Sequence, residues 1–319
     1  MLLFSYLYHI FNSNYSGFIL IKILIVLAII LACVVLARKS RTQYLGLEGF
    51  TQKEPFILKE GESIYDDFYC QIYDEIHKPE QRRDFELMTI VKSTQPSKKS
   101  IILDVGSGTG HLVNELRESG YNAYGIDKSD AMVSYSEKKF PKSDYRCETA
   151  LEPMTFEKST FSHIICSYFT IYEFQNRRTF FRNCFFWIQP GGYLILHLAD
   201  MKKFDTITPI GKASLKENPQ RFSKKRITDT VVDFPDYEYK SSFQVKENEN
   251  LVILKETFKD KSSQNIRQNE HVLYMDSMET ILSEAQENGF LLHSKTDMSS
   301  CIDDENQYIY ILERIQGNL

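Results

Sequence analysis

Residues 104–110 combine one carboxylate with three alternate glycines, in the order Asp104-Val105-Gly106-Ser107-Gly108-Thr109-Gly110. The apolar run 101–103 before them is typical of a short strand buried inside a parallel sheet. The stretch 111–117 after them has helical spacing, with three apolar residues on one face. Glycine lets a backbone turn approach a ligand closely, and a helix start offers free N–H groups to a polar or anionic group. The segment therefore predicts a strand, a ligand-binding turn and a helix.

A second carboxylate, Asp127, ends the next predicted strand, residues 121–127, and follows Gly110 by 17 residues. In nucleotide-binding α/β folds, a carboxylate at this place can accept both hydroxyl hydrogens of a ribose. The glycine spacing differs from the dinucleotide fingerprint G-x-G-x-x-G, because the third glycine comes one residue early. The turn and Asp127 together therefore predict a ribose-containing ligand, in a spacing that is not that of a dinucleotide site.

The spacing D-x-G-x-G-x-G resembles the first motif of class I S-adenosylmethionine-dependent methyltransferases, and three further segments match that family in order. Residues 127–132 resemble its D-x-S-x-x-M, whose methionine borders the adenine. Residues 147–149 occupy the place of its G-D-A, where Glu148 is expected to accept the adenine amino group, although Cys147 and Glu148 depart from the pattern. Residues 187–196 match the turn and strand that follow the fourth crossover helix.

The resemblance implies S-adenosyl-L-methionine as the cofactor and a methyltransferase of the small-molecule type, with a sheet inserted after the fifth strand. The residues that it implies for cofactor binding are Asp104, Gly106, Ser107, Gly108, Gly110, Asp127, Lys128, Met132, Glu148, Thr149 and Tyr168.

The order of the predicted elements is that of an α/β fold with a doubly wound, Rossmann-like seven-stranded sheet. After Asp127 we expect a helix at 129–139, strands at 144–147 and 163–168, a helix at 175–187, a strand at 192–198, a helix at 277–288 and strands at 290–296 and 307–313. Ligands in such sheets bind outside the carboxyl ends of the strands. This places Asp104, Asp127, Glu148, Tyr168 and His197 on one rim.

Methyl transfer is an in-line displacement, in which aligning the reactants supplies much of the rate and a base helps when the acceptor is protonated. Tyr168 and His197 are the candidate catalytic residues, although a histidine at a strand end is more often structural. Similar methyltransferases carry a Tyr-Asp-containing helix that closes over the cofactor. The predicted helix 63–76 makes Tyr69 and Tyr73 candidate substrate contacts, and Tyr172 is a third. Each tyrosine can instead pack against the sheet.

Residues 200–275 separate the fifth strand from the last helix of the core. Four alternating runs, 228–233, 237–246, 250–259 and 268–275, predict an inserted antiparallel sheet. It resembles the accessory sheet that roofs the substrate pocket of small-molecule N-methyltransferases, and a dimerisation or packing surface is the alternative. We therefore expect a methyltransferase domain over 63–319 with an accessory insert at 200–275.

Residues 1–40 predict a membrane anchor. Within them, residues 18–37 contain Lys22 as their only charge, and a helix of this length spans about 30 Å, the thickness of a bilayer. A signal peptide or a buried core helix are the alternatives, but the N-terminal residues 1–17 lack Lys and Arg, and the stretch is not amphipathic.

Basic residues follow this stretch at positions 38, 39 and 41. By the positive-inside rule they predict a single-pass protein whose catalytic domain lies on the cytosolic side of a membrane. The polar residues 41–62 are expected to form a tether between the anchor and the domain.

The whole chain of 319 residues has a net charge of −5, and its compact basic run beyond residue 100 is 224–226. This charge argues against nucleic acid as the main partner. Six scattered cysteines, without metal-type clustering with histidine, predict reduced thiols and no metal site.

Two functions remain open. One is a membrane-anchored methyltransferase acting on a small-molecule, lipid-associated or protein acceptor. The other is a membrane-anchored scaffold that keeps the fold without catalysis. The glycine turn and Asp127 favour the enzyme, whereas Cys147 and Glu148 leave the scaffold open.

Overall fold

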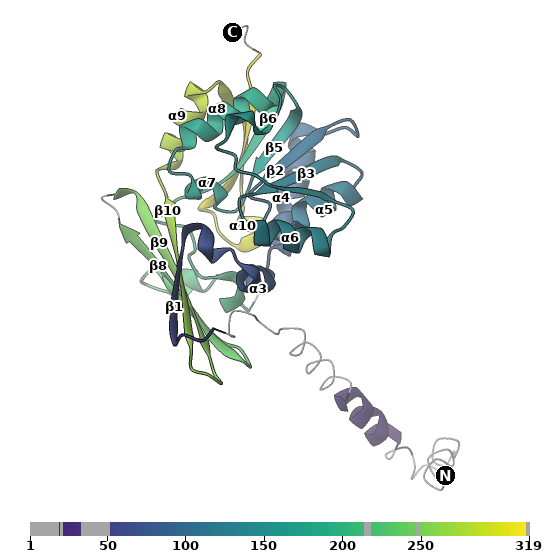
Figure 1. Ribbon diagram of the computed structural model, residues 1–319, viewed down its shortest axis with the longest axis vertical. Coiled ribbons are helices and arrows are strands. Elements are labelled where there is room, and N and C mark those ends of the chain that lie inside the picture. The colour runs from purple at the N-terminus through teal and green to yellow at the C-terminus, as the bar shows by residue number, and fades with distance from the viewer. Residues whose placement is uncertain (1–18, 20–21, 33–51, 214–217, 247–248, 317–319) are drawn as a thin grey trace. The chain divides into compact units, whose positions relative to one another are not determined.

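The structure, a computed structural model, describes residues 19, 22–32, 52–213, 218–246 and 249–316 (Figure 1). The chain divides into two units, residues 1–47 and residues 48–319. The second unit contains two β-sheets, a seven-stranded main sheet and a five-stranded accessory sheet.

The main sheet has the strand order β11-β12-β6-β5-β2-β3-β4. Its strands are β2 (Ile101–Val105), β3 (Asn122–Asp127), β4 (Asp144–Cys147), β5 (Phe161–Cys166), β6 (Ile188–Ala199), β11 (Phe290–Asp297) and β12 (Gln307–Arg314). Strands β4, β3, β2, β5 and β6 pair in parallel, while β12 runs antiparallel to both β6 and β11. The predicted doubly wound, Rossmann-like seven-stranded sheet is therefore confirmed as a mixed sheet.

Helices cover both faces of this sheet. Successive side chains of a strand point to opposite faces, and here both faces are apolar, so each needs a layer of helices to bury it. Leu103 of β2 and Ile164 of β5 belong to one hydrophobic core, while their neighbours Ile102 and Ile165 belong to a second core. The helices of the second unit are α3 (Asp67–His77), α4 (Glu80–Thr94), α5 (His111–Glu118), α6 (Asp130–Lys139), α7 (Thr170–Glu173), α8 (Arg177–Trp187), α9 (Met278–Glu287) and α10 (Ser299–Ile302).

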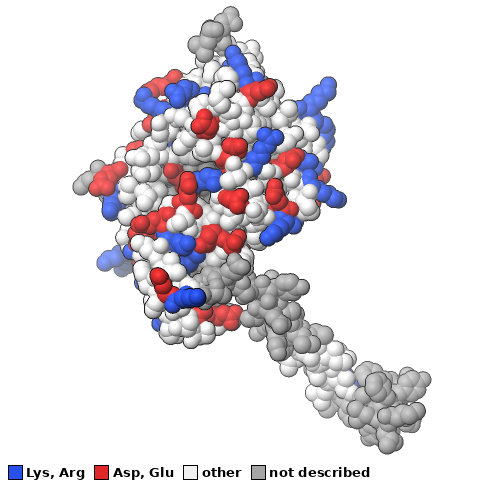
Figure 2. All heavy atoms as spheres, in the orientation of Figure 1, with Lys and Arg blue, Asp and Glu red and all other residues white. Residues whose placement is uncertain are grey.

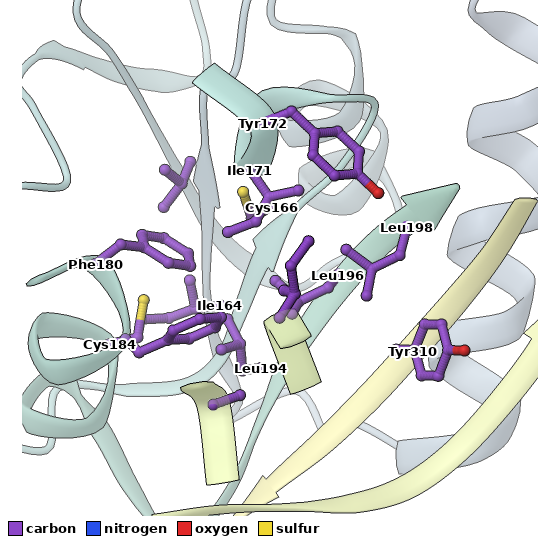
Figure 3. Close-up of a cluster of buried hydrophobic side chains, with 14 of the residues drawn as sticks. Ile164, Cys166, Ile171, Tyr172, Phe180, Cys184, Leu194, Leu196, Leu198 and Tyr310 are labelled. Atoms are coloured by element: carbon purple, nitrogen blue, oxygen red, sulfur yellow. The ribbon is translucent and has the colours of Figure 1, made fainter. Parts of the chain in front are cut away.

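The larger core lies between the main sheet and helices α7, α8 and α9 (Figure 3). Tyr172 is part of this core, and its side chain is fully buried. Its hydroxyl accepts a hydrogen bond from the Ala199 backbone N–H at 2.8 Å. The prediction that Tyr172 contacts the substrate is therefore corrected, because the hydroxyl of this tyrosine links α7 to the end of β6 through a hydrogen bond.

The accessory sheet has the order β1-β10-β9-β8-β7. Its strands are β1 (Phe56–Glu60), β7 (Asp229–Asp233), β8 (Tyr237–Lys246), β9 (Leu251–Asp260) and β10 (Ile266–Tyr274). The four strands of the insert are antiparallel, as predicted, but β1 adds to β10 in parallel. The structure thus corrects two expectations: the accessory sheet is mixed, and the predicted tether 41–62 ends in a strand.

The first unit is described only at residues 19 and 22–32, which are helical. Residues 18, 20–21 and 33–37 of the predicted membrane span lie outside the described residues. Among those that are described, no helix has the length and apolar character needed to cross a membrane.

The surface of the second unit carries both signs of charge. On the face shown in Figure 2, acidic and basic side chains are intermixed. The five cysteines that the structure describes are free thiols.

Candidate active site

A first cavity, which we call the glycine-loop cavity, lies at the carboxyl ends of β2, β3 and β4. It is lined by Gly106 and Gly108 of the turn, by Asp127, Lys128 and Met132, and by Glu148, Thr149 and Ala150. Tyr65, Tyr73, Thr170, Glu173 and Phe174 complete its wall. This is the rim on which parallel α/β sheets bind their ligands.

Asp127 is one of the carboxylic residues that line this cavity. Its Oδ2 accepts the Gly108 N–H at 2.9 Å, and its Oδ1 accepts the Ser129 N–H at 2.9 Å. Burial raises the pKa of this carboxyl, while the two N–H groups act in the opposite direction. Each carboxylate oxygen has more than one lone pair, so both keep capacity for a ligand hydroxyl.

The glycine turn leaves the cavity open. Gly108 has a φ of +50°, and a Cβ added there would meet no atom within 4 Å. Gly106, at φ +71°, is crowded from the other side, since its Cβ would lie 2.6 Å from the Thr170 side chain. The turn thus combines a backbone conformation that favours glycine with free space in front of it, which fits a bulky ligand such as a nucleoside.

Polar contacts hold helix α3 over this turn. Each contact joins Asp74 of α3 or Tyr65, which precedes the helix, to a residue in or near the cofactor motifs. Asp74 accepts hydrogen bonds from the Thr109 hydroxyl at 2.6 Å and from Lys139 Nζ at 2.7 Å, and lies 2.8 Å from His111 Nε2. The Ser129 hydroxyl donates to the Tyr65 carbonyl at 2.6 Å. These contacts place Tyr65 and Tyr73 beside the glycine-loop cavity.

A second cavity, which we call the tyrosine cavity, shares Tyr65, Tyr73, Thr170 and Glu173 with the first. Its other walls come from α3, from residues 168–169 after β5, and from the insert. The insert contributes residues 204–209 and the side chains of Lys212, Tyr239, Phe243, Leu254, His271 and Leu273. The accessory sheet therefore lines a cavity beside the glycine turn, and Figure 1 shows α3 where this sheet approaches the main one.

A hydrogen-bonded group of aromatic side chains forms one wall of the tyrosine cavity. His77 Nε2 lies 3.2 Å from the Tyr69 hydroxyl, and His77 Nδ1 lies 3.0 Å from the Tyr168 hydroxyl. Burial lowers the pKa of His77 to about 4, so this imidazole is neutral at pH 7. The Arg82 guanidinium lies 3.6 Å from the centre of the Tyr168 ring.

Behind this wall lies Glu256 of β9, a fully buried carboxylate. Its Oε1 accepts from the Tyr239 hydroxyl at 2.8 Å, and its Oε2 lies 2.9 Å from His271 Nε2. Burial alone would raise the pKa of Glu256, but the hydrogen bond and charge of His271 outweigh it and lower the pKa to about 2. An ionised glutamate thus supports the cavity from inside the accessory sheet.

The structure brings most of the predicted cofactor-binding residues together. Seven of them line the glycine-loop cavity: Gly106, Gly108, Asp127, Lys128, Met132, Glu148 and Thr149. Asp104, Ser107 and Gly110 do not line it. Asp104 is buried in β2, and Gly110, at φ +80°, begins α5 and accepts the Tyr145 hydroxyl at 2.7 Å.

Tyr69, Tyr73 and Tyr168, the predicted substrate or catalytic tyrosines, line the tyrosine cavity, and Tyr168 does not line the glycine-loop cavity. Their roles stay predictions. His197 lines neither cavity. Its side chain is buried, its Nε2 lies 3.0 Å from Gln307 Oε1, and Phe169 stacks on its ring. Burial lowers the pKa of His197 to about 3. The structure therefore corrects its placement on the rim, because β6 continues past it to Ala199.

Four residues that the sequence motifs missed occupy prominent positions in the cavities. Glu173, which accepts from Tyr65 and lies 3.0 Å from Lys128 Nζ, stands where the cavities meet. His77, Arg82 and His271 reach the tyrosine cavity from α3, α4 and β10. No sequence motif could identify these four residues together, since each lies in a different helix or strand.

Comparison with known proteins gives one family match, one curated relative and several solved structures of similar fold. Residues 103–196 match the family described as a methyltransferase domain. A stretch of 76 residues is 29% identical to an uncharacterized methyltransferase from Alkaliphilus oremlandii (strain OhILAs) and covers 24% of this chain. This match spans 32% of that protein's length, about a third of the curated relative.

Two solved structures share the fold of the second unit. An S-adenosylmethionine-dependent methyltransferase from Clostridium acetobutylicum is 18% identical, with a TM-score of 0.58 over 78% of this chain and 98% of that one. CalS10 from Micromonospora echinaspora, an amino pentose methyltransferase solved with S-adenosylmethionine bound, is 15% identical. Its TM-score is 0.50 over 76% of this chain and 97% of that one. At these identities the likeness concerns the fold.

Proposed function

We propose that this chain, which carries a class I S-adenosylmethionine-dependent methyltransferase domain, transfers a methyl group from S-adenosylmethionine to a small molecule in the tyrosine cavity. The observation that carries this proposal is the junction of the two cavities at Tyr65, Tyr73, Thr170 and Glu173. A cofactor whose ribose lies on Asp127 and an acceptor in the tyrosine cavity would meet there. Of the structural relatives, CalS10 acts on an amino pentose, which is a small molecule.

The residues of this chain bind and align the two reactants. S-adenosylmethionine, when bound, would supply a methyl group activated by a positively charged sulfur, so that an acceptor lone pair can bond to the methyl carbon while the carbon–sulfur bond breaks and the neutral thioether S-adenosylhomocysteine leaves. Asp127 would hold the ribose hydroxyls, and Glu148 would accept from the adenine amino group. Tyr65 and Tyr73 would cover the junction and exclude water from it. The walls of the tyrosine cavity would hold the acceptor in line with the methyl group. His77 and Tyr168 lie in hydrogen-bond contact and line the cavity where His197 does not. They would orient the acceptor there rather than take its proton, since burial lowers the pKa of His77 to about 4 and raises the pKa of Tyr168.

The glycine turn gives the sharpest test of cofactor binding. In Gly108→Val, the branched side chain would occupy the open space of the glycine-loop cavity, so calorimetric titration with S-adenosylmethionine should show no binding. Gly61→Val is the matched control, because Gly61 has a similar φ of +55° and equally free space but lies outside both cavities. Equal affinity in the wild type and Gly108→Val would contradict the assignment. Absence of binding in the wild type would favour the scaffold alternative.

We also propose that residues 18–37 anchor the protein in a membrane, with the catalytic domain on the cytosolic side. The support is the sequence, in which Lys22 is the only charge of the stretch, and the large apolar side chains exposed on the described helical residues. Among these are Ile23, Leu24, Leu27, Ile29, Ile30 and Leu31. Exposed apolar surface of this kind is unfavourable in water and marks an interaction site.

This proposal predicts that the full chain stays in the membrane pellet after carbonate extraction. A version that begins at Arg41 should be recovered in the soluble fraction with unchanged S-adenosylmethionine affinity. Protease added to sealed cells should leave residues 60–319 intact if the basic residues at 38, 39 and 41 lie in the cytosol. Full-length protein in the detergent-free soluble fraction would contradict the anchor.

A further inference from the structure

The inference concerns Arg82 and rests on the proposed function of the tyrosine cavity. Arg82 lies in the first turns of α4, and 8% of its surface is exposed. It lines the tyrosine cavity together with Tyr73, His77 and Tyr168. Its guanidinium covers the face of the Tyr168 ring, so its position in the wall is fixed by packing as well as by charge.

The Arg82 guanidinium interacts with the Tyr168 side chain, but one of its N–H donors has no hydrogen-bond partner among the described residues. Its Nε is buried without a hydrogen-bond partner. The nearest carboxylate is Glu86, whose Oε1 lies 3.6 Å from Arg82 Nε and also lacks a hydrogen-bond partner. Burial raises the pKa of Glu86 to about 7, so at neutral pH Glu86 neutralises the arginine only in part. A buried charge without full pairing is costly unless a further partner completes it.

The other charged side chains that line this cavity have closer partners. Glu173 accepts a hydrogen bond from the Tyr65 hydroxyl and forms an ion pair with Lys128, whose Nζ lies 3.0 Å from Glu173 Oε2. Lys212 and Asp205 form a buried ion pair with each other. Arg82 differs from them, since its Nε and the neighbouring Glu86 Oε1 lie 3.6 Å apart and neither makes a hydrogen bond.

We propose that Arg82 binds an oxyanion of the methyl acceptor, a carboxylate or a phosphate, and so selects anionic small molecules. The planar guanidinium presents several N–H donors in a fork that matches such groups. Tyr73 lines both cavities and belongs to the same wall as Arg82. An anionic group held by Arg82 would therefore lie in the same cavity that reaches the junction at Tyr73.

The test uses the full chain with acetate and inorganic phosphate as probes, at constant ionic strength and with chloride as the reference salt. Ligands that bind the folded state raise its Tm. We expect acetate, phosphate or both to raise the Tm of the wild type by about 2 °C or more. Arg82→Gln should lose this shift, whereas Lys92→Gln, which removes an exposed positive charge from the same helix, should keep it. A Tm shift with acetate alone would indicate that the acceptor carries a carboxylate, and a shift with phosphate alone would indicate that it carries a phosphate.

The same variants are titrated with S-adenosylmethionine to separate the two proposals. Equal cofactor affinity in Arg82→Gln and the wild type, with the oxyanion response lost, supports both. An oxyanion response in a wild type that binds no S-adenosylmethionine would leave the anion site standing and overturn the proposed function. If Arg82→Gln does not fold, the double variant Arg82→Met with Glu86→Leu removes both charges together. An oxyanion shift that persists in either variant, or is absent from the wild type, overturns the inference.

Discussion

Replacing Asp127 with alanine should weaken S-adenosylmethionine binding by two or more orders of magnitude. Two ligand hydroxyls would lose a charged acceptor, and hydrogen bonds to charged groups contribute about 1.5–3 kcal/mol each. About 1.4 kcal/mol corresponds to a tenfold change in Kd. The same carboxylate receives the Gly108 and Ser129 N–H groups, so its loss would also release the glycine turn. Calorimetric titration of the variant and the wild type measures the difference.

Two further variants make this result specific. Asp130→Ala removes a nearby exposed carboxylate from the first turn of α6 and should leave the affinity unchanged. Asp127→Asn keeps one oxygen acceptor and should fall between the wild type and Asp127→Ala. Circular dichroism and Tm values would show whether each variant is folded. A folded Asp127→Ala protein with wild-type affinity would refute the ribose assignment.

The second large effect is expected on stability, at Glu256. Removing a buried carboxylate leaves the donors bonded to it unsatisfied, which typically costs about 1–3 kcal/mol for each group. Glu256→Ala would strand His271 and the Tyr239 hydroxyl inside the accessory sheet. We expect a loss of about that size for each of these groups in the free energy of unfolding. Denaturant titration can follow it through Trp187, the single tryptophan of the chain, which is fully buried.

Glu270→Ala is the matched control for Glu256→Ala. Glu270 belongs to the neighbouring strand β10 and pairs with Lys255 at 2.9 Å, but both side chains are partly exposed. Such surface pairs contribute about 0–1 kcal/mol. A loss at Glu256 no larger than the loss at Glu270 would show that the buried pair does not stabilise the fold.

The stabilisation by Glu256 should depend on pH in a defined direction. Its pKa in the folded protein is about 2, below the ordinary value of 4.5. A carboxyl with a lowered folded pKa stabilises the protein above its unfolded pKa, and this contribution is lost as the pH falls from 4.5 towards 2. The stability difference between the wild type and Glu256→Gln should therefore shrink across that window. A difference that grows on acidification would contradict the ionised state.

The main sheet and the glycine-loop cavity could be predicted because their signals are local. Each cofactor-binding motif sits where a strand ends, so the order of strands places the motifs on one rim. The strands of the insert were equally clear, since a half-buried strand alternates with period two. The predicted run 237–246 coincides with β8.

The tyrosine cavity could not be predicted in the same way, because it forms only when distant elements meet. Its walls come from α3, α4, the segment after β5 and the accessory sheet. His197 lies near a strand end, whereas the two histidines that line the cavity are His77, which ends a helix, and His271, which lies within a strand of the insert. Strand β1 was missed because it is short and its apolar residues Phe56 and Leu58 are exposed, so its alternation does not indicate burial.

The parallel pairing of β1 with β10 has a consequence for folding during synthesis. Phe56 is opposite Ile266, about 210 residues further along the chain. At about 5–20 residues per second, the ribosome would release β1 roughly 10–40 s before its partner strand. During that interval the backbone N–H and C=O groups of β1 have no partner strand, so they can pair with another segment or another chain. The accessory sheet and the tyrosine cavity should therefore form late in synthesis, after the residues of the glycine turn have been released.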